Sequence, residues 1–342
     1  MLCDANLLIL AMTNSLPYQA LVLVSFGGPE KPEEVLPFLD RVLHGRNVPQ
    51  QRKLEVAEHY HHFGGRSPIN EQNRVLRDAI ERELRRRGIP LPVYWGNRNW
   101  HPLLEDTARE MRRQGVERAL AFVTSAFGSY SGCRQYREDL DRAAGAVHNE
   151  ITFDKIGPFF SHADFIAAQA QHLAAAFAAI PLERQTAAAI LFSAHSIPLR
   201  MAQSSPYAAQ LETAAQLIAS AWARLQPDLP ATAWQLVYQS RSGPPGQPWL
   251  EPDILTALRQ AASRSVRDVV VAPVGFLSDH MEVLYDLDFE ARHVAEELGL
   301  NFYRAATVGH HPTFIHMIGA LVEERLQGAV VDVCDAACCR MG

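Results

Sequence analysis

The chain has 342 residues, of which 48% are hydrophobic and 20% charged, a composition typical of a globular protein long enough for two hydrophobic cores. Its 32 Lys and Arg against 38 Asp and Glu give a net charge of −6, which excludes a strongly basic protein that binds nucleic acid. No stretch approaches the ~20 apolar residues of a membrane span, and no positive residue precedes the short apolar run 5–12, so that run is a poor signal peptide.

The charges are unevenly spread along the chain. Residues 1–150 carry 20 Lys and Arg and 19 Asp and Glu, whereas residues 151–342 carry 12 and 19. This asymmetry suits an anionic ligand held by the first half and a cation handled by the second. We expect a cytoplasmic protein without a transmembrane segment. We also expect translation to start at Met12, which N-terminal sequencing would contradict by finding Leu2 or Cys3.

Short apolar runs alternate with helical patterns in the first half. Strands are predicted at 20–26, 92–97 and 118–124, and helices at 32–43, 71–87 and 103–114. Residues 44–47 and 59–70 are predicted to form a loop-rich region. Strand–helix alternation at this period predicts parallel βαβ units.

The second half shows the same alternation. Strands are predicted at 187–192, 234–238, 269–274 and 301–304, and helices at 161–180, from about 205 onward, and at 313–326. A loop rich in Gly and Pro, YQSRSGPPGQPWLEP, follows the second of these strands. The order of the elements predicts two similar α/β halves.

The stretch 269–290, VVVAPVGFLSDHMEVLYDLDFE, is the most informative. Its buried-type apolar run is broken by a glycine and a serine, and a helical pattern then begins with Asp279 well placed to cap it. Asp279, His280 and Glu282 therefore follow the carboxyl end of a strand, where ligands collect in open α/β sheets.

Three acids of this stretch, Glu282, Asp286 and Glu290, are spaced four apart and so share one helix face. Like charges at this spacing disfavour a helix by roughly a few tenths of a kcal/mol each. A row of carboxylates beside an imidazole suggests an approach path and a binding site for a cation. The same spacing is equally compatible with an ordinary amphipathic helix whose acidic face is solvated.

His195 follows the apolar run 187–192 in the segment SAHSIP. A histidine just past a buried strand is at least as often a core residue with satisfied hydrogen bonds as a functional one. The residues alone leave both interpretations open.

The segment SDHMEVLYDLD, residues 278–288, resembles the string SDHxExLYxLD of the ferrochelatases, which insert ferrous iron into a porphyrin. SAHSIP matches the metal-site histidine motif of the same family. The resemblance runs from about residue 21 to residue 326 through several independent motifs. Within the family, SFGGPE, HFGGRSPIN and SYSGCRQYRE look most like the actinobacterial-type coproporphyrin ferrochelatases.

The resemblance implies two flavodoxin-like α/β domains, each with a parallel sheet, and a porphyrin cleft between them. An N-terminal porphyrin-pocket domain would span 17–150, and a C-terminal metal-site domain would span 151–311. The last helix, 312–327, would pack back on the first domain, and 328–342 would form a cysteine-rich tail.

The same resemblance assigns the metal site. His195 is implied as base and metal contact, and Glu282 as its carboxylate partner, a pair acceptable to Fe²⁺. Histidine's unperturbed pKa of about 6.5 suits a proton acceptor at neutral pH. Asp279 and His280 would organise the groups around Glu282. Asp286 and Glu290 would attract hydrated cations toward it.

The porphyrin would be contacted by side chains from the N-terminal loops. Phe26 occupies a place where some relatives carry Tyr or Met near the bound metal, and a phenyl ring cannot be a metal ligand. The other contacts implied by the resemblance are Arg46, Tyr60, Ser67, Arg98 and Tyr136. An Arg side chain suits a porphyrin carboxylate because its guanidinium matches the carboxylate geometry.

The cysteine tail, with Cys334, Cys338 and Cys339, resembles the tails of ferrochelatases that carry a [2Fe-2S] cluster. In actinobacterial-type relatives a cysteine in a YSGC segment completes the set, and Cys133 stands in YSGC here. Four thiolates are what such a cluster needs. Zinc is the alternative, because it also binds four cysteines.

The expected function is insertion of Fe²⁺ into coproporphyrin III during heme biosynthesis, with handoff of the product to a downstream enzyme of that pathway. A coproporphyrin III pocket must offer partners to four propionates, because an unpaired buried carboxylate costs several kcal/mol. Coproporphyrin III is favoured because the resemblance puts Arg46, Ser67, Arg98 and Tyr136 in loops around the cleft, and because no long apolar lip appears in the N-terminal loops. The alternatives are a protoporphyrin IX ferrochelatase, a cobalt or nickel chelatase, and a non-catalytic carrier of a tetrapyrrole or metal.

Overall fold

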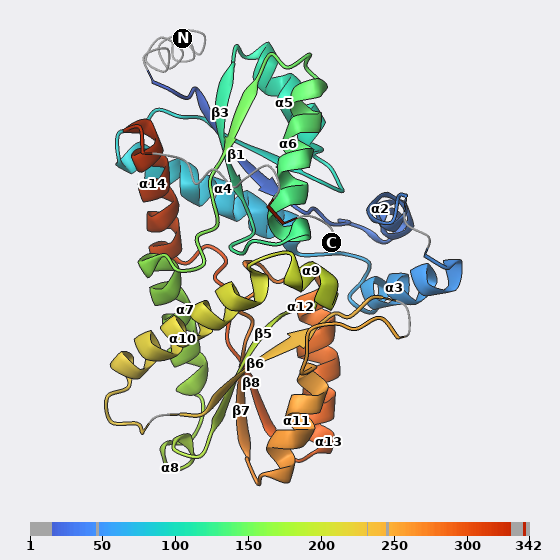
Figure 1. Cartoon of the computed structure of the whole chain (residues 1–342), viewed down its shortest axis with the longest axis vertical. Helices are drawn as coiled ribbons and strands as arrows, with labels where there is room; N and C mark the ends of the chain where they lie inside the picture. The colour runs from blue at the N-terminus through green and yellow to red at the C-terminus, as the bar shows by residue number, and fades with distance from the viewer. Residues whose placement is uncertain (1–15, 46–47, 231, 244–245, 330–337, 340–342) are drawn as a thin grey trace. The chain divides into compact units, whose positions relative to one another are not determined.

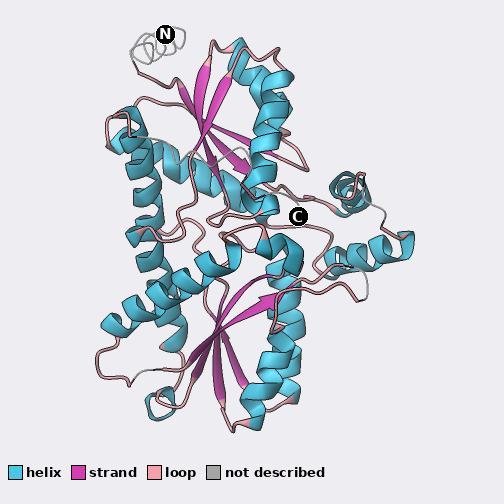
Figure 2. Ribbon diagram, viewed as in Figure 1, coloured by secondary structure: helices cyan, strands magenta, loops and turns pink. Residues whose placement is uncertain are grey.

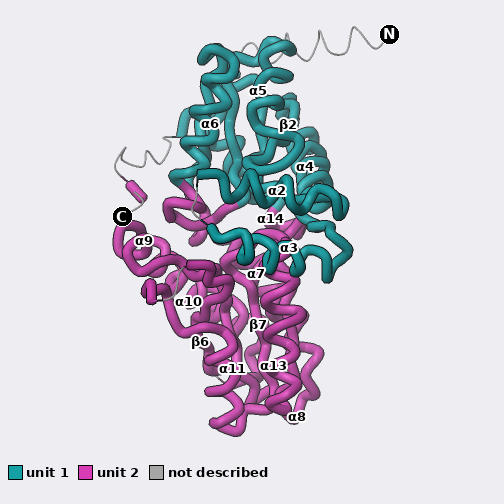
Figure 3. The backbone as a smooth tube through the Cα atoms, turned by 90° about the vertical axis from the view of Figure 1, so that its right-hand side faces the viewer, with its two compact units in different colours: residues 1–124, 134–157, 315–336 teal, residues 125–133, 158–314, 337–342 magenta. Residues whose placement is uncertain are grey.

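The computed structural model describes residues 16–45, 48–230, 232–243, 246–329 and 338–339 (Figure 1). Two residues of the expected sites, Arg46 and Cys334, lie outside these ranges. The chain divides into two compact units, which Figure 3 colours separately. The first unit comprises 1–124, 134–157 and 315–336, and the second comprises 125–133, 158–314 and 337–342.

The first unit is built on a four-stranded parallel sheet in the order β2-β1-β3-β4. Its strands are β1 (Ala20–Ser25), β2 (Val93–Asn97), β3 (Arg118–Val123) and β4 (Thr152–Lys155). The helices in this part of the chain are η1 (Pro32–Glu34), α2 (Val35–Val42), α3 (Gln50–His62), α4 (Ile69–Arg86), α5 (Leu104–Arg113), η2 (Tyr130–Arg134) and α6 (Gln135–Gly145). Strand β1 is buried along its whole length, as an apolar strand covered on both faces must be.

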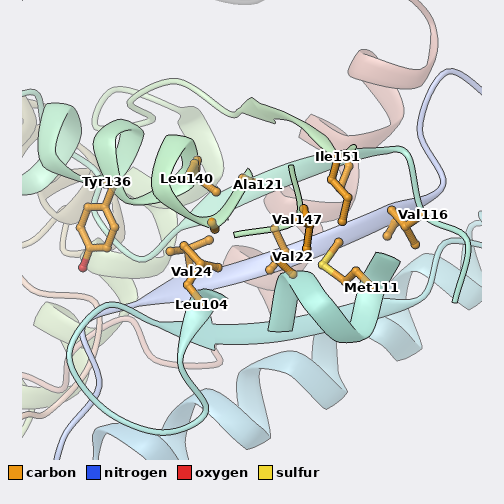
Figure 4. Close-up of a cluster of buried hydrophobic side chains, with 14 of the residues drawn as sticks. Val22, Val24, Leu104, Met111, Val116, Ala121, Tyr136, Leu140, Val147 and Ile151 are labelled. Carbon is orange, nitrogen blue, oxygen red and sulfur yellow. The ribbon is translucent and has the colours of Figure 1, made fainter. Parts of the chain in front are cut away.

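Alternate side chains of β1 enter different layers of the core. Val22 and Val24 pack with Leu104, Met111 and other apolar residues of α5 and α6 (Figure 4). Helix α4 lies on the other side of the sheet together with α14 (Pro312–Leu326), whose residues from 315 onward belong to this unit (Figure 1). Arg87, the residue directly after α4, forms an ion pair with Glu323 of α14 at 2.7 Å.

The second unit repeats this architecture with the strand order β6-β5-β7-β8. Its strands are β5 (Ala189–His195), β6 (Trp234–Gln239), β7 (Asp268–Ala272) and β8 (Asn301–Arg304). Its helices before α14 are α7 (Ala163–Phe177), α8 (Leu182–Gln185), α9 (Leu199–Gln203), α10 (Tyr207–Leu225), α11 (Ile254–Ser263), α12 (Met281–Val283), η3 (Leu284–Ala291) and α13 (Arg292–Glu297). Helices flank each sheet in Figure 2, and the expected α/β fold class is confirmed.

The strand order reverses direction between β1 and β3 in the first unit and between β5 and β7 in the second. In open α/β sheets the loops at such a reversal diverge to opposite faces, and ligands bind in the crevice at the carboxyl ends of the strands. In the second unit this point brings together the end of β5, where His195 lies, and the segment that follows β7.

Several elements differ from their sequence predictions. His195 lies inside β5 rather than past it, because pairing with β6 continues as far as His195 opposite Gln239. Residues 59–62, expected in a loop-rich region, form the end of α3. Strand β4 was not predicted, since its sequence TFDK contains no apolar run. It lies at the edge of the sheet, and none of its residues is fully buried.

Candidate active site

His195 ends a strand whose five preceding residues are all buried, so its backbone position is held by the core of the second unit. Its Nδ1–H donates to the carbonyl oxygen of Ser196, which directs Nε2 toward Glu282. His195 Nε2 lies 3.5 Å from Glu282 Oε1, and the two side chains are 31% and 49% exposed. The structure thus brings together the two residues that the sequence assigns to the metal, at a point open to solvent.

Glycine at position 275 allows this approach. A Cβ atom there would lie 2.6 Å from Ala194 Cβ, far inside van der Waals contact. The backbone of the segment after β7 can therefore pass directly against the end of β5, and Gly275 N–H donates to the carbonyl oxygen of Ser193 at 3.1 Å. Glu282 follows seven residues later at the start of α12.

The two charges of the pair shift each other's pKa in opposite directions. Burial alone would lower the pKa of His195, but the Glu282 carboxylate and the Ser196 carbonyl outweigh it and raise that pKa to about 9. The protein atoms around Glu282 remove part of its water and would raise its pKa, although half of the side chain stays exposed. His195, with help from His280, outweighs this effect and lowers the pKa to about 2. At neutral pH the metal-free pair is therefore an imidazolium and a carboxylate. This differs from the sequence expectation of an unperturbed imidazole, because that expectation ignored the charged partner.

The carboxylate of Asp286, in η3, interacts electrostatically with both members of this pair. Burial, reinforced by Glu282 and Glu290, raises the pKa of Asp286 to about 7, although the Ser240 hydroxyl donates a hydrogen bond to its carboxylate. Burial and Asp253 also raise the pKa of Glu290. The segment is a π-helix rather than the α-helix that the spacing suggested, and π-helical turns recur at functional sites.

Asp279 does not cap the helix, so this prediction was wrong. The cap is His280, whose Nδ1 accepts a hydrogen bond from the Glu282 backbone N–H at 3.2 Å. The carboxylate of Asp279 instead accepts hydrogen bonds from Arg304 Nη1 at 3.0 Å and from the Thr307 hydroxyl at 3.3 Å. The cap was missed because Arg304 competes for Asp279, and the sequence does not show that the end of β8 lies beside this loop.

Three further side chains contact this site and were not singled out from the sequence. Tyr207 donates from its hydroxyl to the His195 carbonyl oxygen at 3.0 Å. Gln239 donates from Nε2 to the Glu282 carbonyl oxygen at 3.0 Å, and Ser240 reaches Asp286. Gln239 and Ser240 lie at the start of the Gly- and Pro-rich loop that the sequence analysis did identify, which is the signal that points to them.

The residues expected to contact porphyrin lie in the first unit, apart from Arg46 outside the described residues. The Phe26 ring is 37% exposed in the loop after β1 and stands edge-on to Phe38, with 6.3 Å between centroids. The Tyr60 ring lies 5.8 Å from the same Phe38 ring. Ser67 is buried, and its backbone N–H donates to the Pro29 carbonyl oxygen at 2.8 Å.

Arg98 and Tyr136 also contact each other. The Arg98 guanidinium stacks over the Tyr136 ring at 3.7 Å from its centroid, and Arg98 Nε donates to Asp139. The side chains of Arg98 and Asp139 are only 6% and 2% exposed. The charge of Arg98 is thus matched by a buried carboxylate of the first unit before any ligand is present.

Three of the four cysteines expected to bind a cluster are described. Cys133 is buried in η2, Cys338 is partly exposed and Cys339 is buried, and all three belong to the second unit. Among the described residues no group of three or more His, Cys, Asp or Glu side chains is arranged to hold a metal ion, and Cys334 lies outside them. No helix in the described ranges is long and apolar enough to cross a membrane.

Comparison with known proteins agrees with the motifs. A sequence model of the ferrochelatase family matches residues 18–326. The chain is 48% identical to a ferrochelatase of Rhodopirellula baltica, covering 94% of this chain and 93% of that protein. It is 50% identical to a coproporphyrin III ferrochelatase of Nocardia farcinica, with 91% and 89% covered, and 48% identical to one of Mycolicibacterium smegmatis, with 91% of each covered.

A solved structure of SirB from Bacillus subtilis with Fe³⁺ has a similar fold. Its TM-score is 0.51 at 14% identity, over 90% of this chain and 95% of that one, so the likeness concerns the fold alone. Because the family model covers most of the chain and the relatives match at nearly half of all positions, the protein belongs to the ferrochelatase family.

Proposed function

We propose that the protein inserts Fe²⁺ into coproporphyrin III and releases iron coproporphyrin III. The observation that carries the proposal is the His195–Glu282 pair, with Nε2 and Oε1 3.5 Å apart at the strand-order reversal of the second unit. Family membership supports iron insertion, and the names of the Nocardia and Mycolicibacterium relatives support coproporphyrin III. The reaction exchanges two pyrrole protons for one Fe²⁺ and transfers no electron.

His195 and Glu282 are proposed to receive the metal and one of the protons. While the metal is absent, the imidazolium has no lone pair on Nε2 with which to bind a cation or a proton. A cation arriving at Glu282 competes with the imidazolium for the carboxylate and lowers the pKa of His195. The neutral imidazole is then available as a metal contact or as acceptor of a pyrrole proton. Asp286 and Glu290 supply negative charge along the approach to Glu282.

Substrate choice is tested by comparing kcat/KM for ferrous insertion into coproporphyrin III and protoporphyrin IX under anaerobic conditions without detergent bias. A pocket for coproporphyrin must match four carboxylates, because an unpaired buried carboxylate costs several kcal/mol. We expect higher kcat/KM with coproporphyrin III. Equal or better turnover of protoporphyrin IX would overturn this choice of substrate, and no insertion into either porphyrin would overturn the assigned activity.

We also propose that Cys133, Cys334, Cys338 and Cys339 hold a [2Fe-2S] cluster. Three cysteines that belong to one unit, one of them buried in η2, supply three of the four thiolates that such a cluster needs, and the fourth ligand would be Cys334. A cluster of this kind supplies one-electron redox chemistry when bound.

The protein is further proposed to act in the cytoplasm and to pass its product to a downstream enzyme of heme synthesis.

A further inference from the structure

Gln239 is the residue that connects both members of the His195–Glu282 pair. It stands opposite His195 in the β5–β6 register, and its carbonyl oxygen accepts a hydrogen bond from the Ser196 N–H at 2.8 Å. The Nε2 atom of its side chain donates to the Glu282 carbonyl oxygen at 3.0 Å. One residue therefore bridges the strand that carries His195 and the helix start that carries Glu282.

The orientation of the Gln239 amide follows from this contact. The atom facing the Glu282 carbonyl oxygen must be the N–H donor, because the reversed amide would place two oxygens against each other. Gln239 is 1% exposed, and its Oε1 is buried without a hydrogen-bond partner among the described residues. Within this part of the chain, the side-chain amide makes one hydrogen bond and leaves its acceptor unmatched, which is unfavourable for folding.

The unmatched Oε1 indicates that the Gln239 amide does not serve to stabilise the fold. An apolar side chain of the same length would fill the space of Gln239 without burying an unmatched Oε1, although the Glu282 carbonyl would lose its donor. The amide is therefore poorly explained as a device for stability. What it does provide is a fixed link between Glu282 and the end of β5.

We propose that Gln239 is a positioning residue that sets the spacing of His195 and Glu282 and so determines how well the pair captures the incoming metal ion. This inference rests on the proposed function, in which that pair receives the metal. Gln239 acts through the backbone of Glu282 and touches neither the metal nor the porphyrin. Residues that orient metal ligands in this way typically change metal affinity or activity about 10–100-fold when replaced.

The test compares Gln239→Met with Gln235→Met in the full-length protein. Gln235 is the matched control, because it has the same side chain on the same strand and face but lies at the opposite end of β6, opposite Leu191. We would measure KM for the metal, KM for the porphyrin, kcat and Tm, and also Co²⁺ affinity in the absence of porphyrin. Gln239→Leu, which has no polar side-chain atom, provides a second variant should Gln239→Met fail to fold.

We expect Gln239→Met to weaken Co²⁺ binding and raise the metal KM about tenfold or more, with the porphyrin KM and the Tm unchanged. Gln235→Met should match the wild type. A wild-type metal KM and Co²⁺ affinity in Gln239→Met would overturn the inference, as would a parallel rise of both KM values with a lower Tm. The proposed function fails separately, if the wild type inserts no metal.

Discussion

His195 and Glu282 hold a proton between them when no metal is present. The carboxylate stabilises the imidazolium, and the imidazolium keeps the carboxylate ionised, so each charge is balanced by the other. A metal ion that uses both groups must displace that proton. The metal ion and the proton therefore compete for the same binding site, and the metal affinity depends on pH.

Metal affinity should rise with pH up to the pKa of His195. That pKa is raised to about 9, so the imidazole is protonated at neutral pH and each bound ion releases one proton. Between pH 7 and pH 8.5 the apparent Kd for Co²⁺ should fall about tenfold per pH unit. Calorimetry in buffers of different ionisation enthalpy measures both the apparent Kd and the number of protons released. A Kd that does not change across this range would contradict the assignment of the proton to His195.

Replacing His195 by Ala should reduce insertion about 10²–10⁴-fold, because base and metal contact are both lost, while porphyrin binding persists. Glu282→Gln keeps the shape of the side chain and removes its charge, so it should be similarly inactive. His293→Ala is the matched control, since His293 also pairs with a glutamate, Glu297, at 3.4 Å but is exposed on α13. Retention of more than a tenth of wild-type turnover by His195→Ala would refute its role.

At the scale of elements, η3 carries the acids that follow Glu282, and Arg304 holds the segment at two points. Arg304 Nη1 contacts Asp279 before α12 at 3.0 Å, and Arg304 Nε contacts Asp288 within η3 at 2.6 Å. These contacts fix the segment to the end of β8. The row of acids is thus presented by an anchored element, not by a free helix surface.

Asp286→Asn should raise the metal KM several-fold with little effect on kcat, because it removes a charge on the approach without touching the His195–Glu282 pair. The pKa of Asp286 is raised to about 7, so the carboxyl is largely neutral below that pH and ionised above it. The defect should therefore be larger at pH 8 than at pH 6. Steady-state kinetics with the metal varied at both pH values measures it. Glu297→Gln, on exposed α13, is the control, and an unchanged metal KM would disprove the cation route.

The sequence predicted helices and strands well where their local composition identifies them. It predicted poorly those features that depend on contacts with residues distant in the sequence. Strand β8 begins and ends as predicted, because two aromatic residues that favour strands, Phe302 and Tyr303, follow closely on the turn at Gly299. The π-helical form of η3 was missed, since its residue spacing is also compatible with an α-helix. The bonds of Gln239 and Tyr207 to the site depend on strand register and helix placement, which no local pattern encodes.

At the scale of the whole molecule, the cysteine tail predicts a cofactor. Purified protein should be reddish-brown, with iron and acid-labile sulfide at about two each per chain. Cys133→Ser should abolish the colour because it removes one of four ligands. Absorption spectra with iron and sulfide analysis measure the outcome. Zinc without sulfide would favour a zinc site instead.

The division of the chain into units also bears on the order of events during synthesis. The second unit draws most of its residues from the continuous stretch 158–314, whereas the first needs residues from 315 onward to supply α14 beside α4. A ribosome therefore releases nearly all of the second unit before the first has its last helix. Domains usually fold from the N-terminus during translation. Here the N-terminal unit completes its fold last, because one side of α4 stays uncovered until α14 has been synthesised.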